Sequence, residues 1–397
     1  MSMSMEMGRW LVPDGIEDIL PKEAEQIEFW RRELLDEFSR WGYDLVMTPM
    51  VEFTQSLLTG KAVDLQLDTC QLVDQVSGKM MGVRADMTPQ VARIDAHRLH
   101  TKLPSRLCYA GEVLRARPNA LSSSRSPIQV GAELFGHAGV QSDIEVMELM
   151  LATCHRIGLS HLTLALGHVA IYRALSNLLG LSAEQDAQAQ AMLQRKSLPE
   201  WASWCGELSI SQSHLKDALM ALPKLCGDAQ QVLLDADKVL ARLDKTIDAS
   251  LARLKQVVQH LKMTHEDLAI HLDLTDLRGF KYHTGIVFGV IEPSRQRMIA
   301  SGGRYDDSGS DFGVARPATG FSLDLRQLMD LPLPVHPKKR KRILAPAVAD
   351  LKLVALIHQL RHEGHSVVIG FPDVDWASQK QECDMELVKD NDQWAVR

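Results

Sequence analysis

The sequence predicts an α+β protein built on an antiparallel sheet that helices flank, with a helical insertion and a small C-terminal α/β unit. Strand-like runs are grouped at residues 43–168 and 269–306 without strict β-α alternation, which favours an antiparallel sheet. Residues 170–265 are rich in Ala, Leu, Gln and Lys and poor in strand formers, which indicates helices. The Pro-rich, basic stretch 331–342 is typical of a linker before a further unit.

The domain organisation follows from length and from this linker. A chain of 397 residues is too long for one hydrophobic core, so more than one domain is expected. We predict a first domain at 1–330 with its insertion at about 170–265, a linker at 331–342, and a small α/β domain at 343–397.

Composition and charge exclude several classes of function. An apolar content of 45% and a charged content of 24% are typical of a globular protein. The formal net charge of −7 argues against a nucleic-acid partner, which needs a basic surface. No run approaches the ~18–20 apolar residues that span a bilayer. The N-terminus, MSMSMEMGRW, is not a secretory signal, so we expect a cytoplasmic protein without a membrane partner.

The first elements are marked by helix punctuation and by period-two patterns. A helix begins at Pro21, carries apolar residues at three- and four-residue steps through Phe38, and ends at Gly42. Residues 43–53 follow as a strand, in which Pro49 implies an edge or a bulge.

The later elements alternate strands with short helices. A hairpin at 67–83 turns at Ser77-Gly78, and a helix opens within 84–99. A capping box of Ser142 and Glu145 starts a helix at 143–157. Further strands are predicted at 106–116, 127–136, 162–168, 269–277, 284–291 and 297–306. The last helix of the first domain begins around Phe321 and ends at Met329, and the final unit has strands at 342–350 and 366–372 around a helix near 350–362.

Four polar clusters near predicted strand ends form the candidate site. They comprise Arg84, Asp86 and Thr88; Glu112, Arg115 and Arg117; Gln129 and Glu133; and Arg278, Tyr282 and His283 with the segment 301–306. Carboxylates can bind an ammonium group, arginines a carboxylate or phosphate, and aromatic or amide groups a polar ring. Any one cluster is more often a structural ion pair or a solvated strand face. Four with complementary chemistry in one sheet favour a site for a polar amino acid.

The same segments resemble the catalytic core of class II aminoacyl-tRNA synthetases, specifically histidyl-tRNA synthetase, over roughly residues 10–330. GYDLVMTPMVEF resembles motif 1, YAGEVLRARPNALSSSRSPIQVGAELFG motif 2, and PATGFSLDLRQL motif 3. LRGFKYHTG and SGGRYD resemble the two histidine-recognition segments. The resemblance implies a class II synthetase-like fold and a histidine-binding set of Asp86, Thr88, Arg115, Gln129, Glu133, Arg278, Tyr282, His283 and Tyr305.

The resemblance also assigns roles within this set. Glu133 and Asp86 would hold the ammonium group, Arg278 the carboxylate or the ring, and Gln129 and Tyr305 the imidazole side.

Departures from the synthetase pattern imply that adenylation is lost. Arg117 stands where a glutamate contacts adenine, and Pro127 stands where an aromatic residue stacks on it. Gln327 replaces the ATP-binding arginine of motif 3, which removes a charge that stabilises developing phosphate charge. Arg326 replaces its preceding acid. In the histidine segment, Lys281 and His283 replace an acid and a tyrosine of the RGLDYYTG pattern.

A synthetase-like core without adenylation is similar to the family of ATP phosphoribosyltransferase regulatory subunits. The segment ADMTPQVARI (85–94) and the length of the chain support this resemblance. It implies a non-catalytic subunit that activates a short catalytic subunit and mediates feedback inhibition by histidine in the first step of histidine biosynthesis. It also implies a homodimer through motif 1, built into a hetero-oligomer, and no cofactor.

Two other functions are consistent with parts of the sequence. A divergent histidyl-tRNA synthetase would need a different ATP clamp and tRNA contacts. A metal-dependent hydrolase would use His358, His362 and His365, but the acid of an HExxH motif is missing and the cysteines form no CxxC pair, so no metal site is expected. The basic run 338–342 is interpreted as a solvated charge run.

Overall fold

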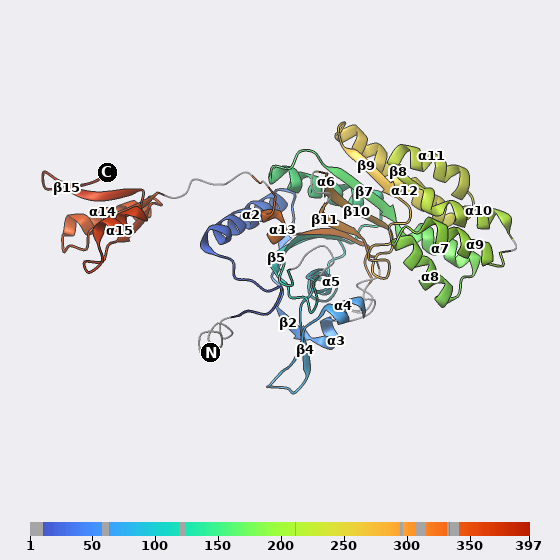
Figure 1. Ribbon diagram of the computed structural model, residues 1–397, viewed down its shortest axis with the longest axis horizontal. Coiled ribbons are helices and arrows are strands. Elements are labelled where there is room, and N and C mark those ends of the chain that lie inside the picture. The colour runs from blue at the N-terminus through green and yellow to red at the C-terminus, as the bar shows by residue number, and fades with distance from the viewer. Residues whose placement is uncertain are drawn as a thin grey trace, which may run out of the picture. The chain divides into compact units, whose positions relative to one another are not determined.

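The computed structural model describes residues 11–57, 63–118, 124–210, 212–293, 297–306, 315–331, 333 and 341–397 (Figure 1). The chain divides into two compact units, residues 1–334 and residues 335–397. Most of the predicted linker 331–342 lies outside the described residues.

The first unit is built on a nine-stranded sheet with the order β1-β5-β6-β12-β11-β10-β7-β9-β8. The neighbours from β5 to β7 in this order all pair antiparallel, which confirms the predicted antiparallel sheet. The strands are β1 (Asp44–Leu45), β5 (Ser105–Glu112), β6 (Ile128–Phe135), β7 (Thr163–His168), β8 (Cys226–Asp228), β9 (Ala269–Asp273), β10 (Ile286–Glu292), β11 (Arg297–Arg304) and β12 (Ala318–Asp324).

One face of this sheet is covered by two long helices, α2 (Pro21–Arg40) and α6 (Val140–Arg156) (Figure 1). The predicted apolar stripe of α2 is confirmed, because Ile27, Trp30, Leu34 and Phe38 are all buried. They pack in one core with Ile128, Val130, Ala132 and Leu134, which are alternate residues of β6. The period of two then turns the other residues of β6 to the opposite face.

The opposite face carries α5 (Thr88–Ile94), which continues as a π-helical turn at Asp95–Leu99. Met87 and Val91 pack there against Leu107 and Tyr109 of β5. A small sheet precedes α5, with β2 (Val51–Phe53), β3 (Gln71–Val73) and β4 (Met80–Val83) in the order β2-β4-β3. The predicted hairpin is confirmed, and Gly78 at φ +70° supplies its left-handed turn residue. Two short helices, α3 (Thr54–Leu57) and α4 (Val63–Asp68), complete this region.

Three predictions of local structure were wrong. Residues 43–53 form two short strands of different sheets, since the extended strand is interrupted around Pro49. Ser142 does not cap α6, which starts at Val140, three residues before the predicted start, with Gly139 as its N-cap. The Ser142 hydroxyl instead donates to the carbonyls of His137 and Gly139. Phe321 lies in the central strand β12, and helix α13 (Leu325–Met329) begins four residues later.

The predicted helical insertion is confirmed, with one short strand, β8, inside it. Its helices are α7 (Val169–Leu179), α8 (Ala183–Gln194), α9 (Leu198–Glu207), α10 (Ser213–Ala221), α11 (Ala229–Leu240) and α12 (Lys245–Thr264), with a 3-10 turn at Leu222–Lys224. Ser182 and Gln185 form a capping box on α8, and the Asp244 carboxylate caps α12. Below, "the insertion" means α7 to α12.

The second unit has a four-stranded sheet with the order β14-β13-β15-β16. Its elements are β13 (Arg342–Ala345), α14 (Leu351–His362), β14 (Ser366–Ile369), α15 (Trp376–Gln381), β15 (Met385–Asp390) and β16 (Gln393–Val396). His358, His362 and His365 are all exposed, and no group of His, Cys, Asp or Glu in the described chain has metal-binding geometry. None of the described helices is long and apolar enough to cross a bilayer.

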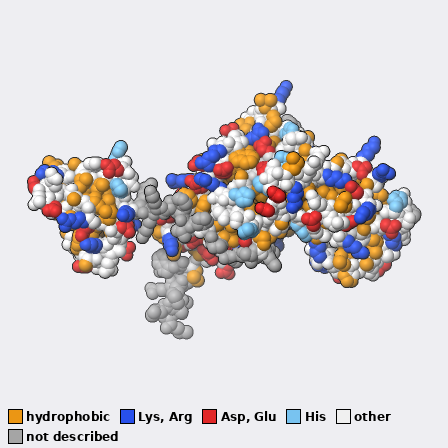
Figure 2. All heavy atoms as spheres, turned by 90° about the horizontal axis from the view of Figure 1, so that it is seen from above, with side chains coloured by type: hydrophobic (Ala, Val, Ile, Leu, Met, Phe, Trp, Pro, Cys, Tyr) orange, Lys and Arg blue, Asp and Glu red, His pale blue; other side chains and the backbone are white. Residues whose placement is uncertain are grey.

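Acidic and basic side chains are interspersed over the face drawn in Figure 2, on both units. This mixture is in keeping with the small net charge of −7.

Leu34 provides a test of how α2 holds the sheet. Its side chain is fully buried, so Leu34→Ala leaves a cavity and is expected to destabilise the first unit by about 2–5 kcal/mol. Urea unfolding followed by tryptophan fluorescence measures the loss. Leu103→Ala is the matched control, because Leu103 is 72% exposed. Equal midpoints for the two variants would contradict the packing of α2 on this sheet.

Candidate ligand-binding site

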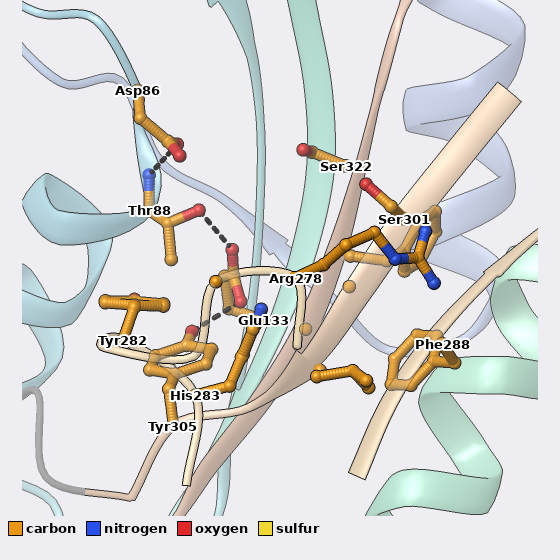
Figure 3. Close-up of a pocket in the computed structure, with 16 residues that line it drawn as sticks. Asp86, Thr88, Glu133, Arg278, Tyr282, His283, Phe288, Ser301, Tyr305 and Ser322 are labelled. Carbon is orange, nitrogen blue, oxygen red and sulfur yellow. Dashed lines mark hydrogen bonds between the residues drawn. The ribbon is translucent and has the colours of Figure 1, made fainter. Parts of the chain in front are cut away.

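A cavity of about 240 Å³ lies over the central strands, on the α5 face of the sheet (Figure 3). Its walls come from the start of α5, strand β6, the loop between β9 and β10, and strands β10, β11 and β12 with Tyr305 after β11. They bring together Asp86, Thr88, Glu133, Arg278, Tyr282, His283 and Tyr305 of the predicted set. Long-range strand pairing therefore assembles most of the predicted site.

Glu133 of β6 is the central polar group of the cavity, and its residue is 1% exposed. Its Oε1 accepts hydrogen bonds from Thr88 Oγ1 at 2.9 Å and from Tyr109 OH at 3.0 Å. Its Oε2 accepts a short hydrogen bond from Tyr305 OH (Figure 3). Burial raises the pKa of Glu133 to about 8, although these hydroxyls partly offset the cost of ionisation. A cationic ligand group would favour the ionised carboxylate.

Gly320 makes room for this carboxylate. It pairs directly with Glu133 across β12 and β6, and a Cβ on Gly320 would lie 1.6 Å from Glu133 Oε2. The glycine in the motif 3 segment therefore serves the pocket wall, because any side chain there would displace the carboxylate.

Asp86 and Gln129 form a second polar group beside Glu133. Asp86 Oδ1 accepts from the Thr88 amide and from Gln129 Nε2, both at 2.9 Å. Gln129 Nε2 also donates to Ser322 Oγ at 3.1 Å, and Gln129 Oε1 accepts from the Met87 amide at 2.9 Å. Gln129 thus positions Asp86 and is not itself part of the cavity wall. Gln129 and Glu133 lie on one face of β6, as the alternation predicts.

The loop 277–285 contributes Arg278, Gly279, Tyr282 and His283 to the cavity wall. Gly279 at φ +59° lets the loop turn, and its Cβ would meet the His283 ring at 2.7 Å. Burial lowers the pKa of His283 to about 4, so its imidazole is neutral at neutral pH, and its Nδ1 has no hydrogen-bond partner among the described residues. The Tyr282 ring stacks on Tyr305, with centroids 5.0 Å apart.

Arg278 is the cationic side chain that this loop contributes to the cavity wall. Its Nε donates to both carboxylate oxygens of Asp276, at 2.8 and 2.9 Å, and its Nη1 contacts the sulfur of Met298. In Figure 3 its guanidinium lies toward Ser301, at the opposite end of the cavity from Asp86 and Thr88. The cavity therefore has an acidic end and a basic end.

Arg115 lies in a second cavity of about 360 Å³, together with Arg117 and Asp68. Asp86 lines both cavities, so they adjoin at its carboxylate. Arg115 makes no side-chain hydrogen bond or ion pair within the described chain; only its backbone is bound, to Arg125. Residues 119–123 of the adjoining predicted loop lie outside the described residues.

The sequence did not predict two lining residues, Gly320 and Ser322, or the hydrogen-bond partner of Glu133, Tyr109. Ser322 and Gly320 belong to β12, part of which was assigned to a helix. Tyr109 could have been found, because it alternates with buried residues of β5 and points to the same face as Leu107. Arg84, which the sequence grouped with Asp86, instead donates to the carbonyls of Glu112 and Thr48 and has a structural role.

The arrangement is suited to binding. Buried acceptors at one end, a guanidinium at the other and aromatic rings between them match a small zwitterion with a polar ring. Within the described chain, no metal-ligand group accompanies them.

Comparisons with known proteins agree on the family. The family model for histidyl-tRNA synthetase matches residues 15–328, and that for the C-terminal domain of the ATP phosphoribosyltransferase subunit HisZ matches residues 340–397. An ATP phosphoribosyltransferase regulatory subunit of Thioalkalivibrio sulfidiphilus is 46% identical over 98% of this chain and 99% of its own length. That of Hydrogenovibrio crunogenus is 49% identical over 90% and 92%.

Solved structures show the same fold. A protein described as an ATP phosphoribosyltransferase regulatory subunit/histidyl-tRNA synthetase from Bacillus halodurans has a TM-score of 0.82 at 25% identity, over 95% of this chain and 97% of its own. A chain of the ATP phosphoribosyl transferase (HisG:HisZ) complex from Thermotoga maritima has a TM-score of 0.58 at 16% identity, over 75% and 97%. This second likeness concerns the fold alone.

The buried carboxyl of Glu133 predicts a pH dependence of stability. Between its ordinary pKa of 4.5 and the raised value of about 8, the folded state holds a proton that the unfolded state has lost. The contribution of Glu133 to stability therefore falls as pH rises through this interval, by at most about 1.4 kcal/mol per pH unit. Glu133→Gln should remove this slope, whereas the exposed Glu184→Gln should keep it. Thermal unfolding between about pH 5 and pH 8 measures it; parallel curves for all three proteins would contradict the assignment.

Proposed function

Because the chain belongs to the family of ATP phosphoribosyltransferase regulatory subunits, we propose that it activates a short catalytic subunit and binds the histidine that inhibits the first step of histidine biosynthesis. The observation that carries the ligand part is the cavity around Glu133, with acceptors at one end and Arg278 at the other. Asp86 and Glu133 would take the ammonium group, and Tyr282, His283 and Tyr305 would enclose the imidazole. The short catalytic subunit would join this chain in a hetero-oligomer, like the HisG:HisZ complex of Thermotoga maritima.

We also propose that this chain has no aminoacylation chemistry of its own. Arg117 lines the second cavity, which Asp86 and Arg115 also line. A cationic side chain therefore stands where the synthetase pattern has an acceptor for adenine. The Arg326 guanidinium donates to the Glu17 carbonyl at 3.2 Å, directed to the segment before α2. The second candidate, a divergent histidyl-tRNA synthetase, is favoured by the match of that family model to residues 15–328.

Calorimetry with histidine tests the ligand. Wild-type protein is expected to bind, and Glu133→Gln to bind roughly 30-fold more weakly or worse, since losing one member of a buried charge pair costs about 2–5 kcal/mol. Glu184→Gln is the control for the lost surface charge. When Glu133→Gln is reconstituted with the short catalytic subunit, histidine should no longer inhibit the activity of the complex. Histidine-driven ATP–pyrophosphate exchange above background would instead support the synthetase.

Self-association through the motif 1 region is a further part of the proposal. Strand β1 is one edge of the nine-stranded sheet, and Leu45 in it and Met47 just after it are 46% and 84% exposed. Apolar side chains exposed beside an unpaired strand edge are typical of an interface.

The dimer can be tested by placing charge in this region. Leu45→Asp combined with Met47→Asp should convert a dimer into monomers, because two buried carboxylates per subunit would oppose association. Sedimentation velocity measures the change. Leu198→Asp is the control, since Leu198 is 49% exposed on the insertion. A double variant that sediments as the wild type does would contradict this interface.

A further inference from the structure

The insertion holds the loop 277–285, which forms part of the cavity wall. Arg173 of α7 donates from Nη2 to the carbonyl oxygens of Phe280, at 2.7 Å, and His283, at 3.1 Å. Its guanidinium also lies over the Phe280 ring, 4.7 Å from the centroid. The ring of Tyr172 packs edge-on against Phe280 at 5.6 Å. Tyr172 and Arg173 of α7 therefore contact both the backbone of the loop and its Phe280 side chain.

The loop depends on this outside support. Within it, the Phe280 amide donates to the Leu277 carbonyl at 3.0 Å, and the amides of Tyr282 and His283 donate to the Gly279 carbonyl at 2.8 and 2.7 Å. At its end, the Thr284 amide donates to the Arg304 carbonyl at 2.8 Å, and the Gly285 carbonyl accepts from the Val169 amide at the start of α7 at 3.0 Å. Short turns have little stability by themselves. Arg173 binds two carbonyls within the turn that Gly279 starts.

Helix α7 is fixed within the insertion. The Tyr172 hydroxyl and Ser176 Oγ donate to Asp186 Oδ1 of α8, at 2.7 and 2.8 Å. Helix α7 also packs on α12. A shift of these helices would therefore be transmitted to the loop through Arg173.

A second link joins the insertion to strand β11, which forms the wall of the cavity beside this loop. Arg253 of α12 donates to Asp143 Oδ2 at 2.7 Å, and Arg304 of β11 donates to Asp143 Oδ1 at 2.9 Å. Both Asp143 and Arg304 are buried, so this ion pair is shielded from solvent. Arg304 precedes Tyr305, whose hydroxyl binds Glu133.

The two links meet at the end of β7. Burial, together with the charges of Arg253, Arg304 and Arg173, lowers the pKa of His168 to about 3. His168 lies at the last position of β7, directly before α7. The charges of all three arginines thus act on the residue where the chain leaves the sheet for the insertion.

We propose that Arg173 and Arg253 are positioning residues through which the placement of the insertion sets the shape of the cavity, and with it the affinity for a bound amino acid. The identity of that amino acid as histidine rests on the proposed function. Because binding linkage is reciprocal, a ligand that orders the loop also biases the placement of α7 and α12. Binding of a ligand in the cavity would then change the placement of the insertion, and through it the contacts with other subunits of an assembly.

Hydrogen exchange of the full-length protein tests the link without any ligand. Arg173→Ala should speed exchange of the amides in 279–285 by about tenfold, the scale of one lost charge-assisted hydrogen bond. Arg195→Ala is the control, because Arg195 also lies in the insertion but pairs with Glu200 in an exposed salt bridge. If Arg173→Ala does not fold, Arg173→Lys decides, since lysine keeps the charge but lacks the planar guanidinium. If the amides of 279–285 exchange no faster in Arg173→Ala than in Arg195→Ala, the proposal is overturned.

Calorimetry on the same variants separates this inference from the proposed function. Arg173→Ala and Arg253→Ala should each weaken histidine binding by about tenfold, within the range typical of allosteric coupling. In wild type, histidine should also slow exchange in α7 and α12. If the wild type binds histidine and neither variant changes its affinity, the inference is overturned and the proposed function stands. If the wild type does not bind histidine but Arg173→Ala still speeds amide exchange in the loop, the proposed ligand is wrong. The link between the insertion and the loop is then supported.

Discussion

The carboxyl of Glu133, buried in the middle of the sheet, is the constraint on which the pocket depends. A buried carboxyl needs hydrogen-bond partners, and here they are three hydroxyl groups, from Thr88, Tyr109 and Tyr305. They belong to α5, β5 and the residue after β11, so one side chain fixes the relation of three distant segments. Gly320 leaves the space that the carboxyl occupies. The fold of the first unit and the geometry of the cavity are thus set together.

Periodicity in the sequence predicted the layers of the first unit well. The apolar stripe of α2 and the alternation in 127–136 both reflect burial on one face, so they place α2 over the sheet and turn Gln129 and Glu133 to the other face. Seven residues of the predicted set line the main cavity. This part was predictable because a local pattern alone decides which face each residue meets.

The remainder depends on contacts that no local pattern records. Residues 318–324 lie between β6 and β11, and their alternation is short and interrupted by glycine, so a helix near Phe321 was an equally good interpretation. Ser142 and Glu145 have the spacing of a capping box, but Arg106 binds the Glu145 carboxylate at 2.6 and 2.8 Å. The separation of Arg115 from the main cavity likewise depends on how the sheet residues pack. Tertiary partners outweighed local propensity at each of these positions.

Two buried carboxylates in this unit have opposite surroundings, and the contrast bears on function. Asp143 is bound by two arginines, Arg253 and Arg304, so its charge is already compensated and it serves to join helices to the sheet. Glu133 is bound by neutral hydroxyls within the described chain, in a cavity that a small molecule can enter. A carboxylate without a cation is costly in such a place, and the cost falls when a ligand supplies the charge. The same protein can pair a buried acid with arginine, as Asp143 demonstrates. Glu133 holds a proton at neutral pH, and we propose that it is the group whose ionisation an ammonium-bearing ligand would favour.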